Sequence, residues 1–165
     1  MADEPKEDRE QDYVIETCVP RDLTAAEIAT CVAIVSKGEA VRPKSMEREL
    51  PLAGVLAVVR KGRQIVGVGA IKRVRARYAE TIANRSGESF PADTPELGYV
   101  ALDPRHRGNH LSPRIVAALL AKHRGPLFAT TDCDRMKSGL SKAGFVRKGG
   151  EWEGGRDRLS LWLKH

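Results

Sequence analysis

Residues 97–113 have the residue types and spacing of an anion-binding loop between a strand and a helix. The apolar run 97–102 predicts a strand, and Asp103-Pro104 ends it. A basic stretch around Arg107 follows. Ser112 with Pro113 then predicts the start of a helix, because serine is a favoured N-cap and proline suits the first helical position. Backbone N–H groups and the positive end of the helix dipole would face the loop, an arrangement that most often binds phosphate.

Two common phosphate-binding motifs do not match this segment. The dinucleotide fingerprint needs three glycines at fixed spacing before a helix, and the P-loop ends in Gly-Lys with Ser or Thr after it. The other closely spaced glycines, Gly67 and Gly69, lie inside a strand pattern that no helix follows. We therefore interpret them as strand glycines.

The run Arg107-Gly108-Asn109-His110-Leu111-Ser112 resembles the acyl-CoA pyrophosphate loop of the GNAT superfamily of N-acetyltransferases, usually written R-G-x-G-x-G. Arg107 and Gly108 fit that pattern. His110 stands where glycine is usual, and its Cβ would crowd the approach of a diphosphate to the backbone. Ser112 stands where glycine or alanine is usual.

A second landmark of the same superfamily lies further along the chain. Many GNAT members end a helix in Leu-Tyr-x-Lys-x-Gly-Phe, and residues 139–145 match that run at Lys142, Gly144 and Phe145. Leu140 occupies the place of the tyrosine. The resemblance covers residues 13–165.

The resemblance implies acetyl-CoA, or another acyl-CoA, as co-substrate and no metal. Arg107, Gly108 and the backbone N–H groups through Leu111 would bind the diphosphate. The residues implied in cofactor binding are Ala101, Leu102, Arg107, Gly108, Asn109, His110, Leu111 and Ser112. Of these, His110 either contacts a phosphate or lies exposed. The pantetheine arm is expected to pair with the strand at 99–102, where N–H groups near Ala101 and Leu102 would polarise the thioester carbonyl.

Acyl transfer to an amine also needs a base for the amine and a proton for the departing thiolate. Glu96 opens the central strand, where a number of GNAT members keep a carboxylate base, and it is the first candidate; a solvated glutamate at the strand edge is the alternative. Tyr78 and Glu80 form a second candidate pair. Because Leu140 has no hydroxyl, Tyr99 is the nearby phenol for the acid step, and water is the alternative.

The elements that must position these residues can be traced by periodicity and turn signals. We expect a fold of the α/β (α+β) class, with a central mixed, mostly antiparallel sheet of about six or seven strands and helices on both faces. The predicted elements are a strand at 13–19, a helix from the Thr24 capping box to Gly38, a short helix near Met46, a hairpin of 54–59 and 64–71, a helix in the second half of 72–87, the central strand, the helix from Ser112, a strand at 127–131, a helix at 134–143 and two last strands near 145–148 and 159–163.

Length and composition are those of one domain with a core of its own. The chain has 165 residues and 41% hydrophobic content, and it contains no apolar run of membrane-spanning length and no signal-peptide core. We expect no membrane partner and a cytoplasmic location. Three widely spaced cysteines fit neither a disulfide framework nor a zinc site. Residues 1–12 are charged and poor in apolar groups, which predicts a disordered acidic tail before a single domain at 13–165.

The charge is concentrated outside that tail. The chain carries a net +6, and residues 1–12 hold six acids and two bases, a net −4, so the rest carries +10. A basic insertion at 72–95 separates the hairpin from the central strand. Its arginines are either a solvated face or a surface for an anionic acceptor.

Three functional hypotheses follow. The leading one is an N-acetyltransferase that transfers an acetyl or other acyl group from the CoA thioester to a primary amine by direct attack. The second is a GNAT-like protein that binds acyl-CoA or nucleic acid without turnover. The third is a modifier of DNA, tRNA or aminoacyl-tRNA that uses the basic face at 72–85. The sequence does not reveal the acceptor, and an oligomer is compatible with it.

Overall fold

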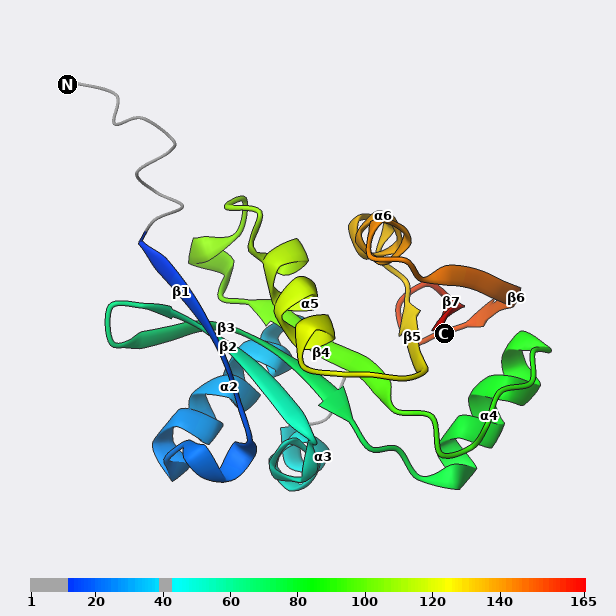
Figure 1. The fold of residues 1–165 in the computed structure, drawn as a ribbon, viewed down its shortest axis with the longest axis horizontal. Helices are drawn as coiled ribbons and strands as arrows, with labels where there is room; N and C mark the ends of the chain where they lie inside the picture. Colours follow the sequence, from blue (N-terminus) through cyan, green and yellow to red (C-terminus); the bar gives the residue numbers. More distant parts are fainter. Residues whose placement is uncertain (1–11, 39–42) are drawn as a thin grey trace.

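The computed structural model describes residues 12–38 and 43–165, which form one mixed sheet with helices on both faces (Figure 1). The strand order is β1-β2-β3-β4-β5-β7-β6. Only β4 and β5 run parallel among the neighbouring pairs of this described sheet. The strands are β1 (Tyr13–Cys18), β2 (Val55–Lys61), β3 (Gln64–Lys72), β4 (Glu96–Leu102), β5 (Leu127–Thr131), β6 (Val146–Glu153) and β7 (Arg158–Lys164). The predicted fold class is confirmed.

Local signals account for where the helices begin and end. In the capping box of the first α-helix, the Glu27 N–H donates to Thr24 Oγ1 at 3.1 Å and the Thr24 N–H donates to Glu27 Oε1 at 3.0 Å. Gly87, with φ of 75°, closes the helix of the basic insertion. The α-helices are α2 (Ala25–Gly38), α3 (Pro43–Glu49), α4 (Ala76–Ser86), α5 (Leu111–Ala121) and α6 (Asp134–Lys142), and the short 3-10 helices are η1 (Pro20–Asp22), η2 (Leu50–Leu52) and η3 (Pro104–His106).

One face of the sheet packs against α5 and α6, and its core includes Ile115 and Leu119 of α5 (Figure 1). The strand glycines permit this packing. A Cβ at Gly69 would collide with Ile115 Cγ2, and a Cβ at Gly67 would lie 2.6 Å from Leu102 Cδ2. The interpretation of Gly67 and Gly69 as strand glycines is therefore confirmed.

The opposite face carries two separate apolar clusters. The first lies under α2 and α3 and includes Cys31 and Met46. The second lies under α4, over the β5–β7–β6 half of the sheet, and includes Ile82 and Phe128. Figure 1 shows α2 and α3 at one part of the sheet and α4 beside β6. Between the two clusters, β4 presents polar side chains.

β4 has two irregularities that open the sheet at its centre. Its register against β3 shifts between Val68 and Ala70, and opposite that shift Tyr99 has φ of 56°, which marks a β-bulge in β4. In the described chain, β4 and β5 pair only where Glu96 lies opposite Phe128. Beyond that position, β4 turns toward the loop at 103–110 without β5 at its side.

The structure corrects some predicted boundaries. Ser112 is not the N-cap of α5: His110 occupies that position, with φ of 54°, so Ser112 lies in the first turn and Pro113 is the third helical residue. β6 runs on to Glu153 instead of ending near residue 148, because it pairs with β7 through an irregularity between Lys148 and Trp152. Apart from its last residue, the predicted acidic tail at 1–12 lies outside the described residues.

Candidate active site

The loop after β4 begins with a tightly bound carboxylate. Asp103 accepts hydrogen bonds from the Arg105 N–H at 3.0 Å and from its guanidinium Nε at 3.3 Å. These bonds lower the pKa of Asp103 to about 2. The carboxylate therefore stays ionised and holds η3 in place at the end of β4.

The middle of the loop is fastened to the first strand. The Tyr13 hydroxyl and His106 Nδ1 are 2.9 Å apart, and the amide of Asn109 donates to the His106 carbonyl at 3.0 Å. Tyr13 is buried. The sequence had assigned no role to His106, because a contact across 93 residues leaves no local pattern. The Asn109 side chain thus stabilises the loop, which leaves its backbone N–H as the group available to a ligand.

Past this anchor the loop turns outward. Arg107, Gly108 and His110 are exposed, and the backbone is left-handed at Gly108, with φ of 83°, as it is at His110. No heavy atom lies within 4 Å of a Cβ built at Gly108. An exposed arginine, an open backbone and the first turn of α5 thus lie together and can accommodate a diphosphate. Pro113 contributes no N–H donor there.

The second group of candidate residues surrounds Glu96 at the start of β4. Glu96 is 3% exposed. Its Oε1 forms an ion pair with Lys72 Nζ at the end of β3, and its Oε2 accepts a hydrogen bond from the Tyr78 hydroxyl at 3.0 Å. The two carboxylate oxygens therefore face a cation and a neutral donor, as a buried carboxylate requires.

Tyr78 reaches this site from the first turn of α4. The residue is 40% exposed, yet its hydroxyl points inward to Glu96. Burial, followed by the negative charge of Glu96, raises the pKa of Tyr78 well above its ordinary value. Tyr78 is thus a neutral hydrogen-bond donor at every physiological pH.

Tyr99, the bulge residue of β4, completes the group on the side of α3. Its hydroxyl donates to Glu49 Oε2 at 3.1 Å, and Lys72 Nζ lies 3.9 Å from the centre of its ring. Burial, with the Glu49 carboxylate adding to it, raises the pKa of Tyr99 to about 12. Tyr99 therefore holds its proton firmly, and its aromatic face stabilises the ammonium group.

We refer to Glu49, Lys72, Tyr78, Glu96 and Tyr99 as the polar cluster. The structure brings together three of the four predicted catalytic residues: Tyr78, Glu96 and Tyr99. Glu80 is exposed on α4 and has no hydrogen bond to the cluster in the described structure. The sequence analysis did not predict Lys72 or Glu49 as site residues. Lys72 belongs to a basic run in the sequence, and Glu49 lies 50 residues from Tyr99, so no local pattern connects the two.

Several solved structures have the same fold over most of the length of this chain. An acyl-CoA N-acyltransferase from Pseudomonas aeruginosa matches with a TM-score of 0.69 at 13% identity, over 93% of this chain and 99% of that one. An acetyltransferase of the GNAT family from Streptococcus agalactiae matches with a TM-score of 0.68 at 12% identity, over 91% and 94% of the two chains. The chain has the GNAT fold.

A further match is FeeM, an N-acyl amino acid synthase from uncultured soil microbes, with a TM-score of 0.64 at 18% identity over 93% of this chain and 90% of that one. No protein-family model matches the sequence, and no curated protein matches it. At these identities the comparisons establish the fold.

The two parts of the candidate site lie at opposite ends of β4. The polar cluster surrounds its first half, and Ala101 and Leu102 lead into the loop with Arg107 at the other end. Leu140, where a tyrosine was expected from the superfamily pattern, is fully buried in the core beneath α6. Leu140 offers no hydroxyl, and the phenol that contacts Glu96 is that of Tyr78.

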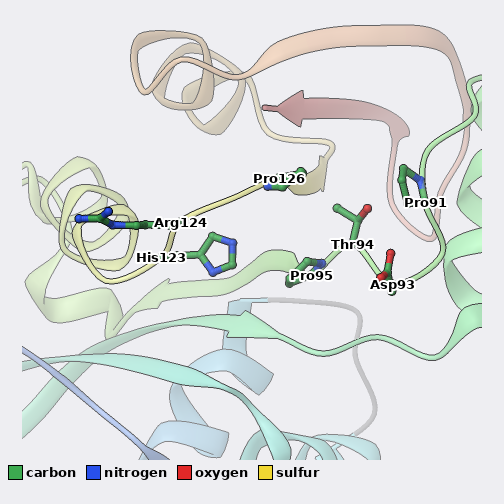
Figure 2. A pocket seen from close by; sticks show the side chains of 7 residues that line it. All are labelled: Pro91, Asp93, Thr94, Pro95, His123, Arg124 and Pro126. Carbon is green, nitrogen blue, oxygen red and sulfur yellow. The ribbon is translucent and has the colours of Figure 1, made fainter.

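A separate pocket of about 380 Å³ lies at the N-terminal ends of β4 and β5 (Figure 2). Figure 2 shows the His123 ring between the segments that carry Pro95 and Pro126, with Asp93 and Thr94 on the other side. None of its lining residues belongs to the polar cluster. This pocket is therefore distinct from the candidate active site.

Two kinds of feature are absent from the described residues. Across residues 12–38 and 43–165, no three His, Cys, Asp or Glu side chains are arranged to hold a metal ion. No helix in the part of the chain that the structure describes is both long enough and apolar enough to cross a bilayer.

Proposed function

We propose that this protein is an N-acyltransferase that moves an acyl group, acetyl in the first instance, from a CoA thioester to a primary amine by direct attack. The observation that carries the proposal is Glu96: a buried carboxylate at the position where β4 still pairs with β5, three residues before the β-bulge at Tyr99. A bulge leaves backbone groups outside the ladder, and beyond Glu96 no β5 residue pairs with β4 in the described structure, so an extended ligand would find β4 backbone groups to pair with.

The loop at 103–110 would hold the CoA diphosphate. Arg107 supplies positive charge, and Gly108 allows close approach to the backbone. The N–H groups of Asn109, His110, Leu111 and Ser112, in or next to the first turn of α5, supply donors at the positive end of the helix dipole. These residues fit a diphosphate, which supports acyl-CoA as co-substrate.

In the reaction, Glu96 would take the proton of the acceptor ammonium, since it is the buried carboxylate of the polar cluster. Backbone N–H groups between the bulge and Leu102 would polarise the thioester carbonyl. Tyr78 donates to the same carboxylate and holds it in position. The thiolate that leaves would be protonated by water, since Tyr99 and Tyr78 hold their protons tightly.

Calorimetry with acetyl-CoA and a CoA-release assay with a panel of primary amines test this proposal. We expect saturable binding, and release of CoA only when an amine is present. Arg107→Ala should weaken binding, whereas Arg63→Ala, an exposed arginine in the β2–β3 turn, should not. Glu96→Gln should lower kcat about 100-fold, in the range for loss of a general base. Binding without CoA release would instead indicate a module that only binds acyl-CoA.

A second candidate is an anionic acceptor such as tRNA or DNA. Arg73, Arg75 and Arg77 are exposed next to Tyr78, and no carboxylate pairs with them within the described structure. Three unpaired cations beside the polar cluster favour a phosphate-bearing partner. Replacing all three by Ala should abolish salt-dependent tRNA or DNA binding, with Arg63→Ala as control; equal binding by both variants would contradict this candidate.

A further inference from the structure

The polar cluster already contains a primary amine in contact with the candidate base. Lys72 Nζ forms an ion pair with Glu96 Oε1, and the two side chains are only 18% and 4% exposed. An ammonium group bound to the general-base carboxylate is the arrangement that the acceptor amine itself needs before attack. Lys72 therefore occupies the position of an acceptor.

The same amine lies against the irregular part of β4. A Cβ built on Gly98 would be 3.2 Å from Lys72 Nζ, so the ammonium passes directly over the residue that precedes the bulge. It also lies 3.9 Å from the centre of the ring of Tyr99, the bulge residue. The amine thus contacts both the candidate base and the bulge residue of β4.

We propose that Lys72 is a site of self-acylation, modified in cis by the acyl-CoA bound to the same chain; this rests on the proposed function. Glu96 removes one proton from the Lys72 ammonium and passes it to solvent. The Nζ lone pair then forms a bond to the thioester carbonyl carbon, the carbon–sulfur bond breaks, and CoA leaves as the thiolate. The thiolate ends as the thiol and the nitrogen loses its second proton, so Lys72 becomes a neutral amide.

Lys137 provides a matched control within the same chain. Its side chain is 24% exposed, close to the value for Lys72, and it also pairs with carboxylates, Glu151 at 3.6 Å and Asp134 at 3.7 Å. It lies on α6, on the other face of the sheet from the polar cluster. The two lysines are therefore similarly exposed and both pair with carboxylates, but the ion pairs of Lys137 are longer and its partners more exposed, and only Lys72 lies beside Glu96 and the bulge.

In the experiment, the 165-residue chain is incubated with acetyl-CoA and no added acceptor. Acetylation is measured by intact-protein mass spectrometry and by peptide mapping. We expect one acetyl group per chain, located at Lys72, with Lys137 modified at least 10-fold more slowly, because a positioned base typically contributes 10²–10⁴-fold. Dilution should leave the rate constant unchanged, as expected for reaction in cis. Lys72→Arg, which keeps the cation beside Glu96, should remove this acetyl group.

Two variants separate self-acylation from chemical background. Arg107→Ala, in the exposed loop, should slow acetylation of Lys72 at low acetyl-CoA and leave Lys137 unaffected. Glu96→Gln should slow acetylation of Lys72 about 100-fold. Equal rates at the two lysines, or rates at Lys72 that neither variant changes, would overturn the inference. So would transfer to added amines with Lys72 unmodified, which would leave the proposed function intact; absence of any acetyl-CoA binding would overturn both.

Discussion

The ion pair between Lys72 and Glu96 leads to a quantitative prediction about stability. Lys72→Met removes the ammonium and leaves the Glu96 carboxylate, 3% exposed, with the Tyr78 hydroxyl as its remaining hydrogen-bond donor among the contacts described above. The variant also removes the cation from the ring of Tyr99. A buried charge without its counter-ion is costly, so the variant should fold less stably than either the native chain or the neutral double variant.

The magnitude follows from how little solvent reaches the pair. Removing one partner of a buried pair costs about 3–5 kcal/mol, and the 18% exposure of Lys72 places this case at about 3 kcal/mol. In a domain of this size that lowers the Tm by about 6–12 °C. Glu96→Gln should cost about 2 kcal/mol, because the ammonium it leaves behind is nearer to solvent. The double variant has no unpaired charge and should cost less than the two single losses combined, with a coupling energy of about 2–3 kcal/mol.

Urea denaturation of the four proteins measures this double-mutant cycle. Lys137→Met is the control: its ion pairs are longer and one partner, Asp134, is exposed, so the change should stay within about 0.5 kcal/mol. If the losses of Lys72→Met and Glu96→Gln add to within about 0.5 kcal/mol, the two groups do not interact, and our reading of the polar cluster is wrong.

Three further predictions concern the frame of the site. Gly69→Ala should destabilise the protein by about 1–3 kcal/mol in urea melts, because its Cβ would collide with Ile115; an unchanged midpoint would mean that α5 does not pack as described. Gly108→Ala should lower the stability by about 1–2 kcal/mol, because alanine is strained in the left-handed backbone at that position, and His110→Gly should raise the stability for the same reason. If thermal melts show that both variants shift the Tm in the same direction, this loop conformation is wrong. The pKa of Asp103 is lowered from 3.8 to about 2 in the folded chain, so its stabilisation is complete above pH 3.8 and is lost as the pH falls toward 2. Asp103→Asn should flatten the loss of stability across that interval, and an unchanged acid profile would contradict the bonds to Arg105.

Local chemistry in the sequence was enough to predict the order of elements. The Thr24 capping box, the turn glycines and the apolar periodicities act within a few residues, so they can be read from the chain directly. The predicted start of α5 was wrong because local signals can also mislead. Ser112 and Pro113 suit a helix start, but the left-handed backbone at His110 begins the helix earlier, and histidine gives no local sign of that conformation.

The sequence by itself determined the fold class, the loop around Arg107 and the candidacy of Glu96, Tyr78 and Tyr99. Only the tertiary structure decided which of these residues meet, and with what partners. Lys72 reaches Glu96 across neighbouring strands, and Glu49 reaches Tyr99 from a separate helix. Such contacts depend on strand register and helix packing, which are set by the burial of distant apolar side chains. A charged residue in a sequence therefore does not show whether its charge will face water or a buried partner.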